Sequence, residues 1–194
     1  PVANDNVVEG NVITGPSGDI GVTVGAFDEG SYTPQTLNTV VDDNVISGYD
    51  VGIQEEGTEA GDVTGNVVRG NGDGIVIEET TDLDVESNVI SGNTGDGIES
   101  LGGNVGLIIG HNTVRTNGRG IVLKSDETAE YNVVSGNANE GILVLGDDNS
   151  VFRNVVRDNE WGIVVEGDAN SVNRNTVNDN DVYGIWAKGT SNSN

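Results

Sequence analysis

The sequence predicts an all-β fold in which the chain coils into a parallel β-helix. Three observations lead to this prediction. A unit of about 22 residues recurs along the 194-residue chain. Each unit holds short β-branched segments separated by Asn and Gly. The 3.6-residue periodicity of an amphipathic helix is absent, and strong helix formers are scarce.

Each unit begins at an asparagine that serves as its anchor. The anchors are Asn11, Asn44, Asn66, Asn88, Asn112, Asn132, Asn154 and Asn175. All but one of the steps between them span 20 to 24 residues, and a fixed period of this size indicates a repeat architecture. Most anchors are followed five residues later by a second Asn, and from Asn44 on a Gly-Ile pair follows after eight or nine. Eight anchors predict about eight rungs.

Three strands are expected in each rung. Apolar residues stand three before the anchor, two after it and one after the Gly, as Val151, Val156 and Ile163 do in one unit. Because side chains alternate between the faces of a strand, each short segment directs one or two residues inward. Stacked rungs would lie about 4.8 Å apart. The anchor amides would then hydrogen-bond from rung to rung, which satisfies a buried Asn column only if every rung contributes. Asn149, in the loop at 146–150, lies outside this column and is expected to tolerate replacement by Ala.

The longest step between anchors contains a loop. About eleven extra residues lie within 25–39, and we interpret them as a surface excursion or end cover, with a groove-forming loop as the alternative. The whole of 1–194 is expected to be a single β-helix domain and part of a longer chain. Neither end shows an obvious cap, so we expect missing sequence, a capping partner or self-association to cover the rod ends.

The repeats resemble those of right-handed parallel β-helix proteins. The segments that carry the resemblance are Asn66–Ile77, Asn88–Leu101, Asn112–Leu123, Asn132–Val144 and Asn154–Val165. Proteins with such repeats include pectate-lyase-like proteins, carbohydrate-binding and sugar-hydrolase domains, and copper-maturation proteins of the nitrous-oxide-reductase accessory type. This resemblance implies the right-handed fold, which hosts many functions. The lyase string Arg-x-Pro-x-x-Arg, the full polygalacturonase set and the epimerase string Tyr-Gly-x-Asp-Pro-His are absent.

The chain is strongly acidic. Its 8 Lys and Arg residues stand against 32 Asp and Glu, for a formal net charge of −24. Duplex nucleic acid is a poor partner for such a surface. The composition resembles that of halophilic proteins, which implies a haloarchaeal source and salt-screened carboxylates. We expect a cell-surface or extracellular location, with the cytoplasm of a halophile as the alternative. No apolar run is long enough to span a membrane.

Three carboxylates form a weak candidate catalytic group. Asp73 and Asp96 occupy the same position on adjacent rungs, about 5 Å apart, and Glu99 follows on the same strand. A hydrated acidic surface is the favoured interpretation. A calcium site and a retaining glycosidase pair are the alternatives, and no other cofactor is expected. The single histidine, His111, rules out a metal site built from several histidines and is interpreted as a turn residue.

Aromatic residues near the C-terminus form the candidate ligand site. Trp161 and Tyr183 share a register position, and Trp186 lies on the same strand as Tyr183. Arg157 and Lys188 would supply cations for acidic sugars. A hydrophobic plug over the end of the rod is the favoured alternative to this platform.

A row of apolar residues points outward after each Gly. Its members are Val76, Val122, Leu143, Val164 and Trp186. An exposed row of this kind suits packing against another chain or a covering segment. The favoured alternative is a simple preference of β-branched residues for strands.

The sequence therefore favours a non-catalytic binding or scaffold module of a surface, secreted or virus-fibre-like protein, with polysaccharide as its ligand. A polysaccharide lyase, epimerase or glycoside hydrolase is the enzymatic alternative. A structural stacking or filament subunit is the third hypothesis.

Overall fold

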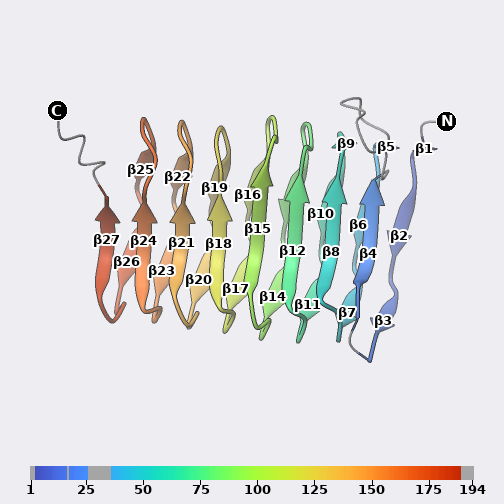
Figure 1. The fold of residues 1–194 in the computed structure, drawn as a ribbon, viewed down its shortest axis with the longest axis horizontal. Helices are drawn as coiled ribbons and strands as arrows, with labels where there is room; N and C mark the ends of the chain where they lie inside the picture. Colours follow the sequence, from blue (N-terminus) through green and yellow to red (C-terminus); the bar gives the residue numbers. More distant parts are fainter. Residues whose placement is uncertain (1–2, 17, 26–35, 189–194) are drawn as a thin grey trace.

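The chain forms a parallel β-helix, as the repeats predict. The computed structural model describes residues 3–16, 18–25 and 36–188. Within them the chain passes eight times through each of three parallel sheets, so about seven full turns separate the first rung from the last (Figure 1). The described residues contain no helix long and apolar enough to cross a membrane.

Sheets B and C are built from three-residue strands. Sheet B contains β2 (Val7–Glu9), β6 (Val40–Asp42), β10 (Asp62–Thr64), β13 (Asp84–Glu86), β16 (Ile108–Gly110), β19 (Thr128–Glu130), β22 (Ser150–Phe152) and β25 (Ser171–Asn173). Sheet C contains β3 (Val12–Thr14), β7 (Val45–Ser47), β11 (Val67–Arg69), β14 (Val89–Ser91), β17 (Thr113–Arg115), β20 (Val133–Ser135), β23 (Val155–Arg157) and β26 (Thr176–Asn178).

Sheet D has longer strands, and a small sheet A lies beside the first rungs. Sheet D contains β4 (Ile20–Gly25), β8 (Val51–Glu56), β12 (Asp73–Glu78), β15 (Asp96–Gly102), β18 (Arg119–Leu123), β21 (Glu140–Val144), β24 (Trp161–Val165) and β27 (Tyr183–Ala187). Sheet A contains β1 (Ala3–Asn4), β5 (Thr36–Leu37) and β9 (Thr58–Glu59). Most of the predicted loop at 25–39 lies outside the described residues, while Thr36–Leu37 is a strand.

The core is a single stack of β-branched and Leu side chains inside the coil. Most middle rungs contribute one residue from sheet B, one from sheet C and two from sheet D, as Val151, Val156, Ile163 and Val165 do. In two rungs the second position of sheet D holds a buried polar residue instead, Glu55 or Ser100. These residues are the predicted inward columns. The inward residues of the first and last rungs are more exposed, and Ile185 of the last rung is 53% exposed.

Two asparagine ladders bracket sheet C. In the anchor ladder, the backbone N–H and the Nδ2 of Asn112 both donate to Oδ1 of Asn132, at 2.9 and 3.1 Å, and Asn132 donates in the same way to Asn154. The second ladder repeats this pattern five residues later, for example from Asn137 to Asn159. The anchor ladder was predicted from the spacing, whereas the second Asn of each unit was noted only as a recurring residue. His111, just before an anchor, is a turn residue as predicted, with φ of 56°.

A third, partial ladder was not anticipated. We expected Asn149 to be a loop residue that tolerates replacement, and this expectation is wrong. Asn149 is 1% exposed. Its Nδ2 donates to backbone carbonyls and to Asn170, and its Oδ1 accepts from the N–H of Glu127. The turn from sheet D to sheet B therefore also stacks buried amides.

Candidate functional site

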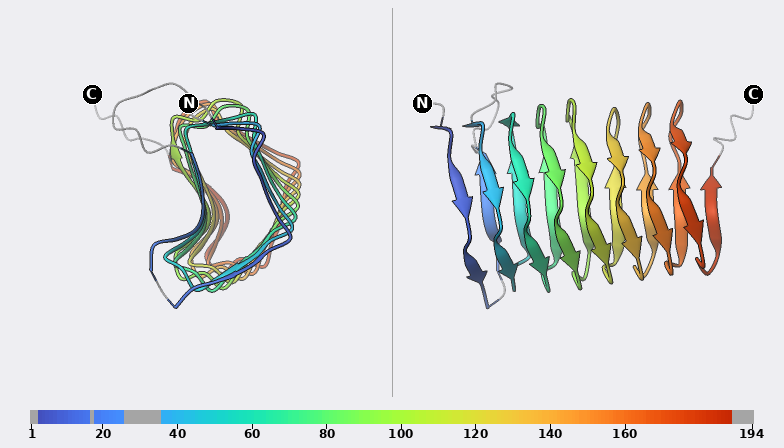
Figure 2. Two further views of the ribbon diagram at one scale, coloured as in Figure 1. Left: turned by 90° about the vertical axis from the view of Figure 1, so that its right-hand side faces the viewer. Right: turned by 180° about the vertical axis from the view of Figure 1, so that it is seen from behind.

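Sheet D forms a concave outer face. Viewed along the axis, the side of the coil that carries sheet D bends inward (Figure 2, left; the same sheet lies at the front in Figure 1). A glycine stands near the start of each strand of sheet D because a Cβ there would meet the next rung. At Gly120, for example, it would lie 2.2 Å from the carbonyl oxygen of Gly141. Outward side chains just before and after these glycines line the concave face.

Three aromatic rings gather at the C-terminal end of this face. We call Trp161, Tyr183 and Trp186 the aromatic cluster. The ring centroids of Trp161 and Trp186 are 5.0 Å apart in a stacked arrangement, and Tyr183 lies 5.7 Å from Trp161 and 5.4 Å from Trp186. The Lys188 ammonium lies 4.5 Å from the centroid of the Trp186 ring and pairs with Glu166. The predicted grouping of the three rings with Lys188 is therefore present.

The aromatic cluster lies on the side of the rod, not over its end. Trp161 and Trp186 pack against an outward apolar group that includes Val164. Ile185, which belongs to the inward core column, remains 53% exposed, and Tyr183 is 49% exposed. Rings that plugged the end would cover Ile185, so the structure does not support the plug interpretation that the sequence favoured.

Arg157 is not part of this group. It lies on β23 of sheet C, in register with Ser135 and Asn178. Its guanidinium pairs with the neighbouring Asp158. Nearness in sequence was the reason for grouping Arg157 with the rings, and the coil places the two on different sheets.

The three candidate carboxylates lie together further along the same concave face. Each of Asp73, Asp96 and Glu99 has an oxygen within 4.8 Å of an oxygen of the others. The backbone N–H of Asp96 donates to Oδ1 of Asp73 at 2.7 Å. The predicted adjacency of the carboxylates is therefore confirmed, whereas their function is not tested by this geometry.

Arg119 is the member of this group that sequence reasoning missed. Its Nε and Nη2 donate to the two carboxylate oxygens of Asp96 at 2.6 and 2.5 Å, and Nη2 lies 3.8 Å from Glu99. The signal was present, because Arg119 occupies the same register position as Asp73 and Asp96, one rung on. Opposite charges on adjacent rungs of one column are expected to pair.

The carboxyl groups of this acidic group differ in their electrostatic surroundings. Burial raises the pKa of Glu99, and the nearby charges of Asp96 and Asp73 raise it further. The hydrogen bond to Asp96 raises the pKa of the Arg119 guanidinium. The group thus combines a carboxyl that holds its proton more tightly than usual with a carboxylate bound to arginine, and such a pair can transfer protons. Carboxylate oxygens also suit calcium, but Arg119 already supplies the positive charge next to Asp96.

The outward apolar row is covered by the chain itself. Val122 and Val164 are fully buried and Leu143 is 5% exposed, packed with Leu145 and the two tryptophans. The sequence suggested packing against another chain or a covering segment, with strand preference alone as the favoured alternative. In the described residues the row packs against side chains of its own chain. The inward bend of sheet D crowds its outer side chains into a second small core.

The fold resembles that of enzymes that act on alginate. A double mutant of the periplasmic alginate epimerase AlgG aligns over 79% of this chain and 46% of its own, with a TM-score of 0.62 and 18% identity. The A-module of the Azotobacter vinelandii mannuronan C-5 epimerase AlgE4 aligns over 81% and 57%, with a TM-score of 0.51 and 18% identity. An alginate lyase from Paenibacillus sp. strain FPU-7 aligns over 93% and 91%, with a TM-score of 0.50 and 12% identity. At these identities the likeness concerns the fold alone.

Comparisons by sequence give one family match and no curated relative. No curated protein sequence matches the chain. The chain spans about half the length of the two epimerase structures, 46% and 57%. The family model described as "Right handed beta helix region" matches residues 51–194, which is most of the chain. The protein therefore belongs to the right-handed β-helix family.

Proposed function

We propose that this chain is a non-catalytic polysaccharide-binding module, and that the aromatic cluster on the concave face is its sugar-binding platform. The observation that carries the proposal is the meeting of three rings on the side of the rod, one of them exposed and two partly buried. Tyr183 is 49% exposed, although Trp161 and Trp186 beside it pack onto buried Val164. Such a platform is open to solvent at Tyr183 and is held from beneath through the two tryptophans.

The chemistry of the cluster fits sugar rings. The apolar faces of pyranose rings stack on Trp and Tyr side chains, while an adjoining charged group fixes orientation. Lys188 supplies that charge beside Trp186, although its pairing with Glu166 offsets part of it. The similar folds of alginate epimerases and of an alginate lyase support a polysaccharide as the ligand, and we therefore expect the module to act outside the cell or at its surface.

An enzymatic function is the second candidate, favoured by the acidic group. Glu99, whose pKa is raised by burial, adjoins Asp73 and Asp96 on the same face. Two arguments favour binding over catalysis. Arg119 engages both oxygens of Asp96, which removes that carboxylate from reaction with a substrate. The lyase and epimerase sequence strings are also absent.

Tryptophan fluorescence tests the proposal directly. The chain has only two Trp residues, Trp161 and Trp186, so its tryptophan emission reports on the aromatic cluster alone. We expect emission to change on titration with alginate or another polysaccharide. Tyr183→Ala keeps both reporters and should weaken binding about fivefold, the equivalent of ~1 kcal/mol for one aromatic contact.

The matched control is Tyr131→Ala, which removes a 38% exposed tyrosine that stacks on His111 instead. It should leave the titration unchanged. An emission that no polysaccharide alters, or an equal loss in the two variants, would contradict the proposed platform. Release of unsaturated or shortened sugars, abolished by Glu99→Gln, would establish the enzymatic alternative in its place.

A further inference from the structure

The outer face of sheet C differs in charge from the other two sheets. Its eight strands contain three Arg and no Asp or Glu. The strands of sheet B contain six acidic residues and no Lys or Arg. Those of sheet D contain seven acidic residues and one Arg. In a chain with 32 acidic residues, sheet C is an acid-free strip along the rod.

The three arginines of this strip form a regular row. They alternate with serines on successive rungs at one register position, in the order Arg69, Ser91, Arg115, Ser135 and Arg157. We call these five residues the Arg–Ser row. Because adjacent rungs lie about 4.8 Å apart, successive guanidinium groups start from Cα atoms about 10 Å apart along the axis.

Two of the guanidinium groups are available to a ligand. Arg69 and Arg115 are exposed, and within 3–16, 18–25 and 36–188 neither forms an ion pair. Arg157 is exposed too, but pairs with Asp158. An arginine on a surface of net charge −24 would ordinarily find a carboxylate partner, and the exclusion of acidic residues from the strip keeps these two free.

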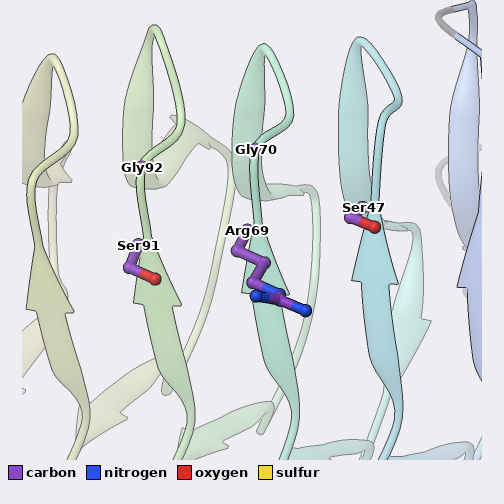
Figure 3. Close-up of a pocket in the computed structure, with 5 residues that line it drawn as sticks. All are labelled: Ser47, Arg69, Gly70, Ser91 and Gly92. Atoms are coloured by element: carbon purple, nitrogen blue, oxygen red, sulfur yellow. The ribbon is translucent and has the colours of Figure 1, made fainter.

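A shallow depression surrounds Arg69. It has a volume of about 390 Å³ and is lined by Ser47, Arg69, Gly70, Ser91 and Gly92. Figure 3 shows Arg69 on the rung between those of Ser47 and Ser91, with the glycines at the turn above. Both glycines have positive φ, and a Cβ at either would meet nothing within 4 Å. The edge of the strip is therefore open, with hydroxyl donors on both sides of a cation.

We propose that the outer face of sheet C binds a linear anionic polysaccharide that lies along the rod axis. A guanidinium binds a carboxylate or sulfate through two parallel hydrogen bonds, and serine hydroxyls bond to ring hydroxyls. An extended chain of linked pyranose rings advances by a length close to one rung per ring. Where successive rings turn over, every second charged group points to the same side, which matches the period of the Arg–Ser row.

A nucleic acid fits this row less well. Phosphates recur along one strand of duplex DNA about every 3.4 Å, much more closely than the arginines. The flanking sheets carry acidic residues, which repel a continuous line of phosphates. The spaced charges of a uronate or sulfated chain meet cations while neutral parts of the sugar lie near the acids.

This site is independent of the aromatic cluster, which belongs to sheet D. Binding should therefore be measured in a Tyr183→Ala background, where the aromatic platform is weakened. Polygalacturonate is the probe, and its fully methyl-esterified form is the matched neutral ligand with the same backbone. Affinity electrophoresis at one fixed salt concentration gives the dissociation constants.

We expect polygalacturonate to bind and its neutral form to bind far less. The double substitution Arg69→Gln with Arg115→Gln should weaken polygalacturonate binding about tenfold, as two exposed ionic contacts predict. Lys124→Gln removes one charge from the end of sheet D and should change binding less than about twofold. Thermal melts check that each variant folds, which exposed positions favour.

Several results would overturn the proposal. Equal affinity for the neutral and charged polysaccharides would show that the guanidinium groups are not engaged. A double variant that behaves like Lys124→Gln would place the charge contacts elsewhere. Single-stranded DNA bound as tightly as polygalacturonate would show that the strip takes polyanions in general. None of these results alters the fluorescence response expected of the aromatic cluster.

Discussion

Every rung contributes one strand to sheet C and one to sheet D, but different interactions hold the strands of the two sheets in register. All strands of sheet C have three residues, with one inward side chain between two asparagine ladders. Strands of sheet D have five to seven residues and begin near a glycine that the next rung closely approaches. Sheet C is therefore held by amides at its edges, whereas sheet D is held by close backbone packing and by burial on both faces.

In sheet C, the residues that stabilise the fold differ from those proposed to bind a ligand. In sheet D, the same residues do both. The ladders bury their amides inside the coil, so the outer residues of sheet C are free to carry arginines. In sheet D, Trp161 and Trp186 both pack on buried Val164 and belong to the proposed sugar-binding platform. Substitutions on the outer face of sheet D should therefore affect folding as well as binding, and those on sheet C only binding.

The largest effect we predict concerns a buried carboxyl in sheet D. Glu55 points into the core between Val24 and Ile77, is 1% exposed, and burial raises its pKa to about 8. Below its ordinary pKa near 4.5, folded and unfolded chains both hold the proton. Between about 4.5 and 8 only the folded chain does, so the free energy of unfolding falls as pH rises through this window, by up to ~5 kcal/mol.

Glu55→Gln should abolish this decline, because glutamine stays neutral. Urea melts at pH 5 and pH 8.5 measure the difference, with Glu56→Gln, which points outward from the same strand, as the control. If the wild type and Glu55→Gln lose stability in parallel between the two pH values, the core of sheet D does not hold a neutral carboxyl.

The next effect tests the close packing of sheet D. A Cβ at Gly120 would lie 2.2 Å from a backbone oxygen that cannot move alone, so Gly120→Ala should cost about 3 kcal/mol. Gly92, after a strand of sheet C, has a φ of 66° and open space around it. Gly92→Ala should cost about 1 kcal/mol, for the left-handed backbone alone. Denaturant melts of equal midpoint would remove this distinction between the two sheets.

A smaller effect is expected at the ladders of sheet C. Asn132→Ala removes the acceptor shared by the backbone N–H and the Nδ2 of Asn112, and a donor to the carbonyl of Ile109, which should cost about 2 kcal/mol. Asn139→Ala removes an exposed side chain that makes one 3.3 Å bond, and should cost less than about 0.5 kcal/mol. Chemical unfolding monitored by circular dichroism compares the two. Similar losses would mean that the ladder contributes no more than surface polar contacts.

The sequence predicted the fold well because register repeats in the residue types themselves. Anchors such as Asn132 and inward residues such as Ile163 recur at fixed offsets, and each occupies the position that its column predicts. The same logic brought Asp73 to Asp96 and Trp161 to Tyr183. Contacts between residues of one column on adjacent rungs could therefore be predicted from the sequence alone.

The curvature of sheet D could not be predicted from the repeats. The inward bend of sheet D buries Val122 and Val164, which alternation alone places outside. The bend also keeps the rings on the side of the rod, where the sequence favoured an end plug. Asn149 was misjudged because its turn between sheets D and B varies in length, which hides the third ladder. Glu55 stands three residues after Gly52, in a column that also contains Ser100, so the residue types alone do not reveal its burial.

The rung architecture finally makes the molecule a ruler. Each rung bonds mainly to its two neighbours, so a repeat that copies the unit around Glu140 can be added between Arg119 and Trp161 with the strand pairing kept on both sides. Every such unit would lengthen the gap between the acidic group and the aromatic cluster by about 4.8 Å. The number of repeats, counted in the gene, thus sets the length of polymer that can touch both places at once.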